Sequence, residues 1–387
     1  MSVIAIVAEY NPFHNGHFYQ IQKIKELFPD AIITSIMSGS LVQRGEIALL
    51  NKYNRAEIAV KCGVDAIFEL PPVYSNAPAN IFTFSAVYII QQLSGVDYIC
   101  FGSEAGDLEI LDFAAEKIMS GEFESRLREK IKTDKNNSYP KNVYNLFREL
   151  YGEEKAAVLN GSNNILAIEY LKALKKLNSE IKPLTIKRTG EDFNASASYI
   201  REYIFEPKIK NYMPEPAYNI FQELIQNGKY TGIRNISAAV ISHINRLNID
   251  EISQIAEVSA IGEAHRIKKS LDGCFDYDSL VEKLTAKHNT PSSVRRMILN
   301  IFFGITKELQ KNPPDFTILL AMNEKGAGFL NSIRKTAKIK IAAKPADVKN
   351  NKTFAKNLFI DNTCKLALFS KDGEINEIKQ KPYKNFV

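Results

Sequence analysis

The 387-residue sequence has no tryptophan and only four cysteines, and its 19 glycines and 15 prolines are few for its length. So little glycine and proline excludes collagen-like and low-complexity chains. The longest apolar stretches, such as Ile298–Ile305, fall well short of the roughly 18 residues that a membrane span needs. The first residues lack the basic start and the apolar length of a secretory leader. These absences predict a folded, globular protein without a membrane segment.

The four cysteines, Cys62, Cys100, Cys274 and Cys364, lie too far apart for a C-x-x-C metal or redox site. Their lack of a pairing pattern is typical of a reducing compartment, so we expect a cytoplasmic protein without a protein-bound metal. The sequence also contains no GxxxxGKS/T, HExxH or GxSxG motif. We therefore expect neither a P-loop NTPase, nor a metalloprotease of the HExxH type, nor an α/β-hydrolase.

Positive charge is concentrated in one segment near the C-terminus. Residues 325–356 hold nine Lys or Arg residues and one acidic residue, a net charge of +8, whereas the whole chain carries +6. A basic segment on a nearly neutral body predicts a surface that binds a polyanion. Nucleic acid is favoured over a membrane because no amphipathic anchor accompanies the segment. A lysine-rich face that is merely solvated is the alternative.

The first 190 or so residues alternate short apolar runs with amphipathic segments, which predicts a doubly wound α/β domain with a parallel sheet. In such sheets, ligands bind just beyond the carboxyl ends of the strands. The predicted strands are Val3–Ala8, Ala31–Met37, Ala66–Leu70, Tyr98–Phe101 and Pro183–Lys187, and the predicted helices between them are Phe18–Leu27, Lys52–Cys62, Ile110–Ser120 and Asn164–Leu177.

The alternation of strands and helices stops after Arg201, where Pro207, Pro214 and Pro216 indicate a boundary. Helical periodicity then continues to about residue 309. The basic segment follows, between the predicted strands Phe316–Ala321 and Leu366–Phe369. We expect a catalytic domain at 1–204, a mainly helical domain at 205–312, and a small basic α+β region at 313–387.

The strongest functional signal is the segment Asn11-Pro12-Phe13-His14-Asn15-Gly16-His17, which follows the first predicted strand and precedes the first predicted helix. A helix N-terminus offers free N–H groups and a favourable dipole to an anion. Gly16 permits close approach of the backbone. We therefore predict that His14 and His17 face a phosphate group. A capping turn with incidental histidines is the alternative.

The segment His14-Asn15-Gly16-His17 resembles the HxGH signature of the nucleotidylyl transferase superfamily. A second stretch, Ala195-Ser196-Ala197-Ser198-Tyr199-Ile200-Arg201, is similar to the ISSTxIR element of the same superfamily. Here Ala195 replaces the leading isoleucine and Ser198 replaces the threonine. Hydroxyl groups at a helix N-terminus bind phosphate oxygens, and Arg201 would add a cationic clamp.

Further motifs narrow the resemblance to the bacterial tRNA(Met) cytidine acetate ligases, over most of the chain from Ser2 onward. The resemblance implies an enzyme that activates acetate with ATP, accompanied by Mg²⁺, as acetyl-adenylate. It further implies transfer of the acetyl group to the wobble cytidine of elongator tRNA(Met), giving N4-acetylcytidine. The motifs are Ala8-Glu9-Tyr10-Asn11-Pro12-Phe13-His14-Asn15-Gly16-His17, Met37-Ser38-Gly39-Ser40, Gln43-Arg44-Gly45-Glu46, Phe101-Gly102-Ser103-Glu104 and Ser162-Asn163-Asn164-Ile165-Leu166.

The resemblance also implies which residues form the ATP site, with His14 and His17 as the catalytic pair. Asn163 offers a donor and an acceptor to the nucleoside. Arg188 offers a guanidinium to the phosphates, unless it pairs with Glu191 or Asp192 at the surface. The implied ATP-binding residues are Val7, Ala8, Glu9, Tyr10, Asn11, Pro12, Phe13, His14, Asn15, Gly16, His17, Phe18, Tyr19, Gln20, Gly102, Asn163, Arg188, Thr189, Ser198 and Arg201.

Ser38, Ser40 and Arg44 follow the second predicted strand and are predicted to bind acetate or a phosphate group. Glu46 offers Arg44 a structural ion pair as the alternative. Glu104 is expected to cap a helix rather than to act in catalysis. The predicted tRNA contacts are Arg266, Arg295, Arg296, Lys335, Lys338, Lys340 and Lys344.

Two other functions stay open at this point. One is an adenylyltransferase that joins AMP to a phosphorylated small metabolite, which the HxGH segment alone permits. The basic segment argues against it, because a small metabolite needs no such surface. The other is a tRNA-binding protein with a vestigial nucleotide site, and the intact His14, Gly16 and His17 argue against that.

Overall fold

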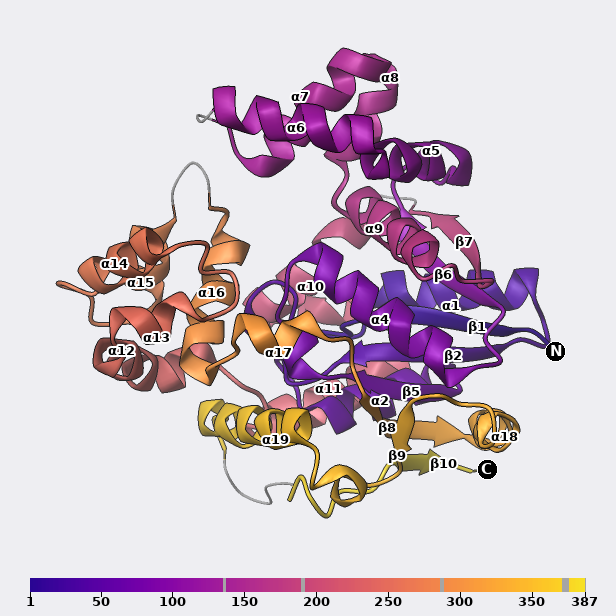
Figure 1. Ribbon diagram of the computed structural model, residues 1–387. Coiled ribbons are helices and arrows are strands. Elements are labelled where there is room, and N and C mark those ends of the chain that lie inside the picture. Colours follow the sequence, from indigo (N-terminus) through magenta and orange to yellow (C-terminus); the bar gives the residue numbers. More distant parts are fainter. Residues whose placement is uncertain (135–136, 189–191, 286–288, 371–375, 387) are drawn as a thin grey trace.

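A computed structural model describes residues 1–134, 137–188, 192–285, 289–370 and 376–386, with the backbone alone at 192–196 (Figure 1). A central sheet runs through the molecule, in the order β10-β8-β5-β2-β1-β6-β7, with β9 also paired to β8. The strands are β1 Val3–Ala8, β2 Ile32–Ser38, β5 Ala66–Leu70, β6 Tyr98–Ser103, β7 Lys182–Lys187, β8 Phe316–Asn323, β9 Lys340–Ala342 and β10 Tyr383–Asn385, with a separate hairpin of β3 Leu41–Val42 and β4 Glu46–Ile47.

The five N-terminal strands of this sheet, β5, β2, β1, β6 and β7, all run parallel. The direction of winding reverses at β1, since β2 and β5 lie on one side of it and β6 and β7 on the other. The carboxyl ends of β1 and β6 therefore form the switch point at which ligands of such sheets bind. The predicted fold class is confirmed, and the five predicted strands agree with the observed ones to within two residues at each end.

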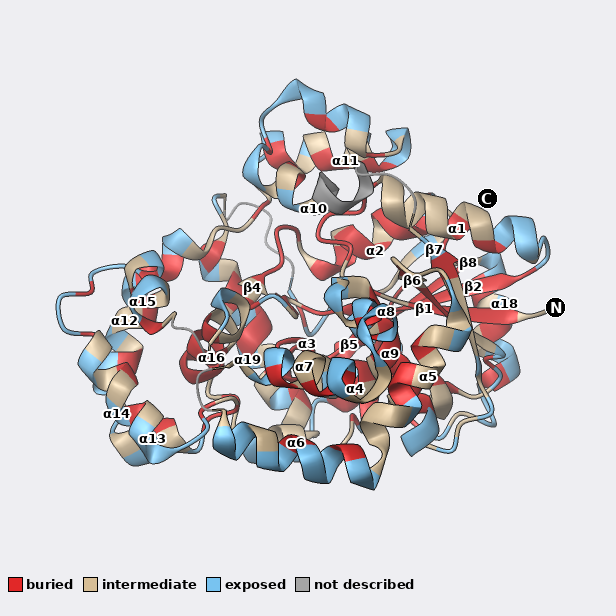
Figure 2. Cartoon of the chain, turned by 90° about the horizontal axis from the view of Figure 1, so that it is seen from above, coloured by how far each residue is buried: buried red, intermediate tan, exposed pale blue. Residues whose placement is uncertain are grey.

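Alternate residues of β1 face two separate hydrophobic clusters. Val3 and Ala5 pack in the cluster that contains α4, α5 and α9, whereas Ile4 and Ile6 pack with α1 and α2. A strand buried on both faces needs a continuous apolar run, which explains why β1 shows no polar alternation. Figure 2 shows the strands of the sheet as mostly buried and α6 as a largely exposed outer helix.

Helices cover both faces of the sheet and also form two groups beyond it (Figure 1). One group, α6 to α8, is inserted between β6 and β7, and its helices were not predicted from the sequence. The other group, α12 to α16, corresponds to the predicted helical segments after the Pro207–Pro216 boundary. None of the described helices is both long and apolar enough to cross a membrane. The helices are α1 Asn15–Leu27, α2 Lys52–Lys61, α3 Pro72–Ser75, α4 Ala79–Leu93, α5 Leu108–Met119, α6 Gly121–Thr133, α7 Tyr139–Tyr151, α8 Glu153–Ala156, α9 Ser162–Lys176, α10 Asp192–Glu202, α11 Glu215–Gln226, α12 Ser237–Arg246, α13 Ile249–Ser253, α14 Ile261–Ser270, α15 Tyr277–Leu284, α16 Pro291–Phe303, α17 Lys307–Lys311, α18 Glu324–Ile333 and α19 Lys352–Cys364.

The C-terminal strands extend the same sheet rather than form one of their own. β8 pairs antiparallel with β5, with Ile67 opposite Ala321, and β9 and β10 pair parallel with β8. The division of the chain at residues 204 and 312 stays a prediction. The predicted strand at 366–369 is wrong, because Lys365–Ala367 form a 3-10 turn after α19 and Leu368 makes only an isolated bridge to Thr231. So short an apolar run does not distinguish a strand from a helix end.

Candidate active site

The turn after β1 is held by hydrogen bonds to segments on either side of it. Asn11 is buried, and its Oδ1 accepts from the backbone N–H of Leu49 at 2.7 Å. The carbonyl of the same residue accepts from Nη1 of Arg201 at 2.9 Å. These contacts place His14 and His17 at the carboxyl end of β1, in the first turn of α1.

Both histidines cap α1 through their Nδ1 atoms. Nδ1 of His14 accepts from the backbone N–H of Gly16 at 3.0 Å, and Nδ1 of His17 accepts from the backbone N–H of His14 at 3.2 Å. In a neutral imidazole one nitrogen accepts and the other donates, so Nε2 of each ring carries the hydrogen. The two interpretations of this segment are therefore compatible: the same rings cap the helix with one nitrogen and keep the other as a donor.

The environment keeps both rings neutral. Burial, followed by the positive charges of Arg188 and Arg201, lowers the pKa of His14 from its usual value to about 3. Burial, followed by His14 and Arg188, lowers the pKa of His17 well below its usual value. At pH 7 the pair therefore presents two neutral N–H donors beside two permanent positive charges, which suits a polyphosphate.

The ends of β6 and β7 and the start of α9 meet beside these histidines. A side chain on Gly102 would place its Cβ 3.3 Å from Cγ of Arg188, so this glycine makes room for the arginine stem. Nη1 of Arg188 donates to Oδ1 of Asn163 at 3.4 Å. The structure thus brings together three predicted ATP-site residues that come from separate segments of the chain.

Glu104 organises the start of α9. Its carboxylate accepts from the backbone N–H of Asn163 at 3.1 Å and from that of Asn164 at 2.7 Å. Burial acts to raise the pKa of Glu104, but the hydrogen bond from Nδ2 of Asn163, together with those from the backbone, outweighs it and the pKa is lowered. The expectation that Glu104 caps a helix is confirmed.

Glu46 binds two arginines, but Arg44 is not one of them. Its Oε2 lies 3.3 Å from Nε of Arg201, and its Oε1 lies 3.1 Å from Nη1 of Arg295 on α16. Arg44 is exposed and makes no ion pair within the part of the chain that the structure describes. The structural alternative for Arg44, pairing with Glu46, is therefore wrong. The predicted contact of Arg44 with acetate or phosphate stays a prediction.

The loop after β2 is held in place by Arg55, a residue that was not predicted from the sequence. Arg55 on α2 is buried, and it donates from Nη1 to the carbonyl of Glu9 at 2.6 Å and from Nη2 to the carbonyl of Gly39. The hydroxyl of Ser40 donates to Oδ1 of Asp361 at 2.6 Å. Ser38 is buried, without a hydrogen-bond partner for its hydroxyl among the described residues. The carbonyl oxygens of Glu9 and Gly39 thus both accept hydrogen bonds from the guanidinium of Arg55.

Most of the other predicted residues in β1 and in the turn after it contribute to the shape of the site. Tyr10 and Phe13 are buried, and their rings lie 5.0 and 5.4 Å from that of His17, centroid to centroid. Glu9 accepts from the backbone N–H of Gln43 at 2.8 Å through Oε1. Burial raises the pKa of Glu9 above its usual value. Val7 and Ala8 complete β1, and Pro12 is buried in the turn.

The remaining predicted ATP-site residues lie on α1 and near α10. Asn15 donates from Nδ2 to the carbonyl of Asn211 at 2.8 Å, and Gln20 donates from Nε2 to the carbonyl of Cys100 at 3.1 Å. Phe18 and Tyr19 are half-buried on α1. Ser198 is exposed and accepts from Nη2 of Arg201 at 3.4 Å. Thr189 lies outside the described residues.

The arginines predicted to contact tRNA are engaged in contacts within the protein. Arg296 donates from Nε and Nη2 to Glu257 at 2.8 and 2.7 Å and is only 13% exposed. Arg266 donates to the carbonyl of Leu284 at 3.1 Å, and Arg295 pairs with Glu46. Arg296 in particular serves to fix α16 to the loop that contains Glu257.

The basic segment does not form one compact surface. Lys335, Lys338, Lys340 and Lys344 are all exposed. They follow α18, which starts next to Asp65 at the amino end of β5, whereas α19, at the other end of the segment, brings Asp361 to Ser40. Figure 1 shows α18 and α19 at opposite ends of the sheet.

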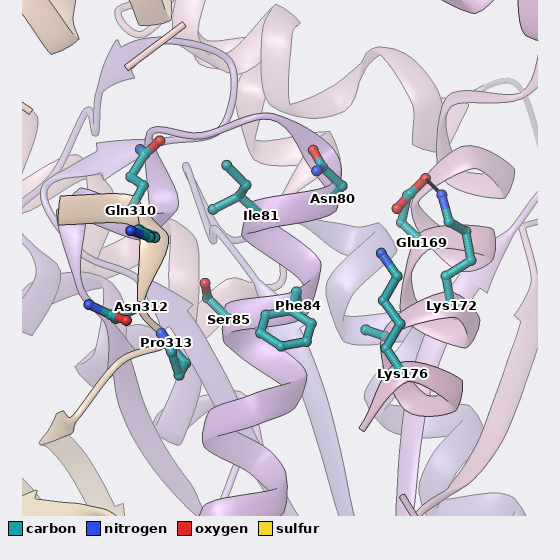
Figure 3. A pocket seen from close by; sticks show the side chains of 12 residues that line it. Asn80, Ile81, Phe84, Ser85, Glu169, Lys172, Lys176, Gln310, Asn312 and Pro313 are labelled. Atoms are coloured by element: carbon teal, nitrogen blue, oxygen red, sulfur yellow. Dashed lines mark hydrogen bonds and ion pairs between the residues drawn. The ribbon is translucent and has the colours of Figure 1, made fainter. Parts of the chain in front are cut away.

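Two cavities lie elsewhere on the molecule. One, of about 230 Å³, lies between α4, α9 and the end of α17 with the residues that follow it, and Lys172 pairs with Glu169 there at 2.6 Å (Figure 3). The other, of about 510 Å³, lies at the amino ends of the strands, beside Asp97 and Tyr98. Neither cavity is lined by a predicted site residue.

A family model described as HIGH Nucleotidyl Transferase matches residues 1–380. The tRNA(Met) cytidine acetate ligase of Clostridium botulinum (strain Okra / Type B1) is 35% identical to this chain over 97% of both chains. This chain belongs to the tRNA(Met) cytidine acetate ligase family of HIGH nucleotidyl transferases. The ligase of Acetivibrio thermocellus is 34% identical, over 90% of this chain and 89% of its own.

Solved structures of a member of this family show the same fold. The crystal structure of Thermotoga maritima TmcAL bound with alpha-thio ATP has a TM-score of 0.92 and 29% sequence identity, with both chains covered completely. The apo structure of the same protein has a TM-score of 0.92 and 28% identity, also over the whole of both chains.

Proposed function

We propose that this protein is an ATP-dependent ligase that acetylates the wobble cytidine of elongator tRNA(Met) to N4-acetylcytidine. The observation that carries the proposal is the helix-capping pair His14 and His17, whose Nε2–H groups are left as donors beside Arg188 and Arg201. The names of the relatives and the ATP analogue bound by Thermotoga maritima TmcAL support it.

In the first step a carboxylate oxygen of acetate attacks the α-phosphorus of ATP. An acyl–phosphate bond forms, the bond to the β-phosphate oxygen breaks, and pyrophosphate leaves, so the products are acetyl-adenylate and pyrophosphate. The Nε2–H groups of His14 and His17 donate to phosphoryl oxygens as negative charge grows on them. Arg188 and Arg201 hold the phosphates in line for this displacement.

Mg²⁺ is proposed to enter with ATP. Among the residues that the structure describes, no group of three His, Cys, Asp or Glu side chains is placed to hold a metal ion. Mg²⁺ commonly binds through substrate phosphates with one or two carboxylates and water, which fits such a site. When bound, the ion neutralises charge on the departing pyrophosphate.

In the second step the exocyclic amine of the cytidine attacks the acetyl carbonyl, and AMP leaves with the electrons of the acyl–phosphate bond. The amine loses one proton, and an amide results. An anticodon-loop cytidine is unpaired, so it reaches the proposed site without melting of a duplex. We propose that residues 1–204 carry both reactions, that 205–312 and 313–387 dock the tRNA, and that the reaction takes place in the cytoplasm.

Exchange of label between pyrophosphate and ATP, measured with and without acetate, tests the proposal. The ligase requires acetate for exchange. The other candidate, an adenylyltransferase acting on a phosphorylated metabolite, would show no dependence on acetate, and this result would overturn the proposal. Mass spectrometry of tRNA(Met) after incubation with ATP and acetate then checks for a single acetyl group on the anticodon cytidine.

A further inference from the structure

A buried ion cluster joins α2, β5 and α19 under the loop that follows β2. Nζ of Lys52 lies 2.9 Å from Oε1 of Glu69 and 2.6 Å from Oδ2 of Asp361. Oε2 of Glu377 lies 3.8 Å away on the other side. Lys52 is 2% exposed, and its three partners are also buried. Segments from both ends of the chain therefore meet at one ammonium group.

Among the residues that the structure describes, carboxylates outnumber cations in the ion pairs of this cluster. Lys52 faces three carboxylates, and Lys365 lies 3.8 Å from Glu377. Burial, opposed by Lys52, raises the pKa of the Glu69 carboxyl to about 7. Buried ion pairs are weak contributors to stability, because desolvation offsets their attraction. A cluster of this kind therefore calls for a role in fixing geometry.

The geometry that it fixes is that of residues 38–40. The second oxygen of Asp361 accepts from the hydroxyl of Ser40 at 2.6 Å. The backbone N–H of Gly39 donates to the carbonyl of Leu70 at 3.0 Å. A Cβ on Gly39 would lie 2.5 Å from Oε1 of Glu69, so the loop rests directly on the cluster.

The same loop is tied to the turn that leads to the catalytic histidines. Arg55, one helical turn after Lys52, holds the carbonyls of Glu9 and Gly39 with its two terminal nitrogens. The loop therefore forms one side of the proposed site, where the carboxylic acid substrate must meet the α-phosphate of ATP. Any shift of Asp361 would reach this loop through Ser40, with no contact to ATP required.

We infer that Asp361 and Lys52 are positioning residues for the carboxylic acid substrate, so that α19 of the C-terminal region helps to build the acid-binding part of the site. The inference rests on the proposed function and on the prediction that Ser38, Ser40 and Arg44 bind acetate or a phosphate group. It gives the C-terminal region a part in the first step, in addition to docking tRNA. The chemical class concerned is a small monocarboxylate that enters beside the β2 loop.

The decisive variant is Asp361→Asn, assayed by acetate-dependent pyrophosphate exchange in the full-length protein. Loss of one charge-assisted hydrogen bond should raise KM for acetate about tenfold. KM for ATP and the affinity for tRNA should change less than about twofold. Lys52→Met should raise KM for acetate as Asp361→Asn does. Lys52→Arg keeps the positive charge, so it should raise this KM less.

The matched control is Glu169→Gln. It breaks the Lys172–Glu169 pair, which is 2.6 Å long and remote from the proposed site, and it should change none of these constants.

A double-mutant cycle with Ser40→Ala separates positioning from general damage. Because Asp361 is argued to act through Ser40, the double variant should raise KM for acetate no further than Asp361→Asn alone. Additive effects, an unchanged KM for acetate, or an equal rise in KM for acetate and ATP would each overturn the inference. Should Asp361→Asn fail to fold, Lys52→Arg must show a smaller but still selective rise in KM for acetate, because Ser40 is itself a predicted acetate-binding residue. The wild-type requirement for acetate tests the proposed function separately.

Discussion

The rings of His14 and His17 lie 3.8 Å apart, centroid to centroid, and each ring caps the first turn of α1 through Nδ1. Capping fixes the orientation of both rings before any ligand binds. Their Nε2–H donors are therefore preorganised, and no reorganisation is needed when charge develops on a phosphoryl oxygen.

Replacing either histidine by alanine should lower the rate of pyrophosphate release far more than it weakens ATP binding, because the donors act mainly on charge in the transition state. His14→Ala also removes a helix cap, at a cost of about 1 kcal/mol in stability. His14→Ser keeps an oxygen at the capping position, so the rate of pyrophosphate release should fall while the free energy of unfolding stays that of the wild type. Single-turnover rates, ATP dissociation constants and melting curves check this. A loss of affinity as large as the loss of rate would contradict the proposed role.

Stability should depend on pH through His14. The pKa of His14 is about 3 in the folded protein and near 6.5 in the unfolded chain. Between these two pH values the unfolded chain takes up a proton on His14 and the folded chain does not. The unfolded state then binds more protons, and the free energy of unfolding falls as pH falls through this range. Between pH 6 and pH 5 the wild type should lose about 1 kcal/mol more than His14→Ser, by urea denaturation. Identical pH profiles would show that His14 is not kept neutral by folding.

Gly102→Ala should weaken ATP binding several-fold. The added Cβ would lie 3.3 Å from Cγ of Arg188 and would move its guanidinium relative to Asn163. The control is Gly121→Ala, where an added Cβ meets no atom within 4 Å. Isothermal titration with ATP compares the two variants, and equal affinities would mean that Arg188 does not depend on this contact.

Acetyl-adenylate should form without tRNA, because the predicted ATP-site residues precede residue 202 and the basic segment contributes none of them. Purified protein should release pyrophosphate from ATP and acetate alone. Release that begins only when tRNA is added would contradict this and would show that RNA completes the catalytic site.

Replacing Lys335, Lys338, Lys340 and Lys344 with glutamate should abolish acetyl transfer to tRNA and leave acetyl-adenylate formation intact. Each lost phosphate contact removes roughly 0.7–0.9 from the slope of log affinity against log salt, so the slope should flatten by about three. A control with the same change of charge replaces Lys132, Lys155, Lys176 and Lys182, which are exposed elsewhere. An unchanged affinity and salt slope would indicate a merely solvated face and would move the docking site to Arg266, Arg295 and Arg296.

The sequence was sufficient to predict the parallel strands and the histidine turn, because both depend on local patterns. Apolar runs between amphipathic segments specify strands buried on two faces, as β1 shows. The HxGH segment is recognisable within four consecutive residues. Glu104 was expected to cap a helix, but the helix that it caps, α9, starts some 60 residues later in the chain and could not be named from the sequence.

The contacts that hold the β2 loop could not be predicted from the sequence. Asp361 and Ser40 are distant in the chain, and no periodicity links them. Lys52 and Arg55 stand on an ordinary amphipathic helix, where such residues normally face solvent, and only the tertiary structure shows them to be buried. The antiparallel pairing of β8 with β5 was missed for the same reason, since an apolar run does not specify its partner.

That pairing has a consequence for how the protein is made. On the ribosome β5 is complete long before residues 316–323 emerge, so until then it is the open edge of a nascent sheet. Open edges template non-native strand pairing and aggregation. The nascent chain thus passes through a vulnerable interval that ends only when β8 is translated, and a premature stop before residue 316 would make that vulnerability permanent.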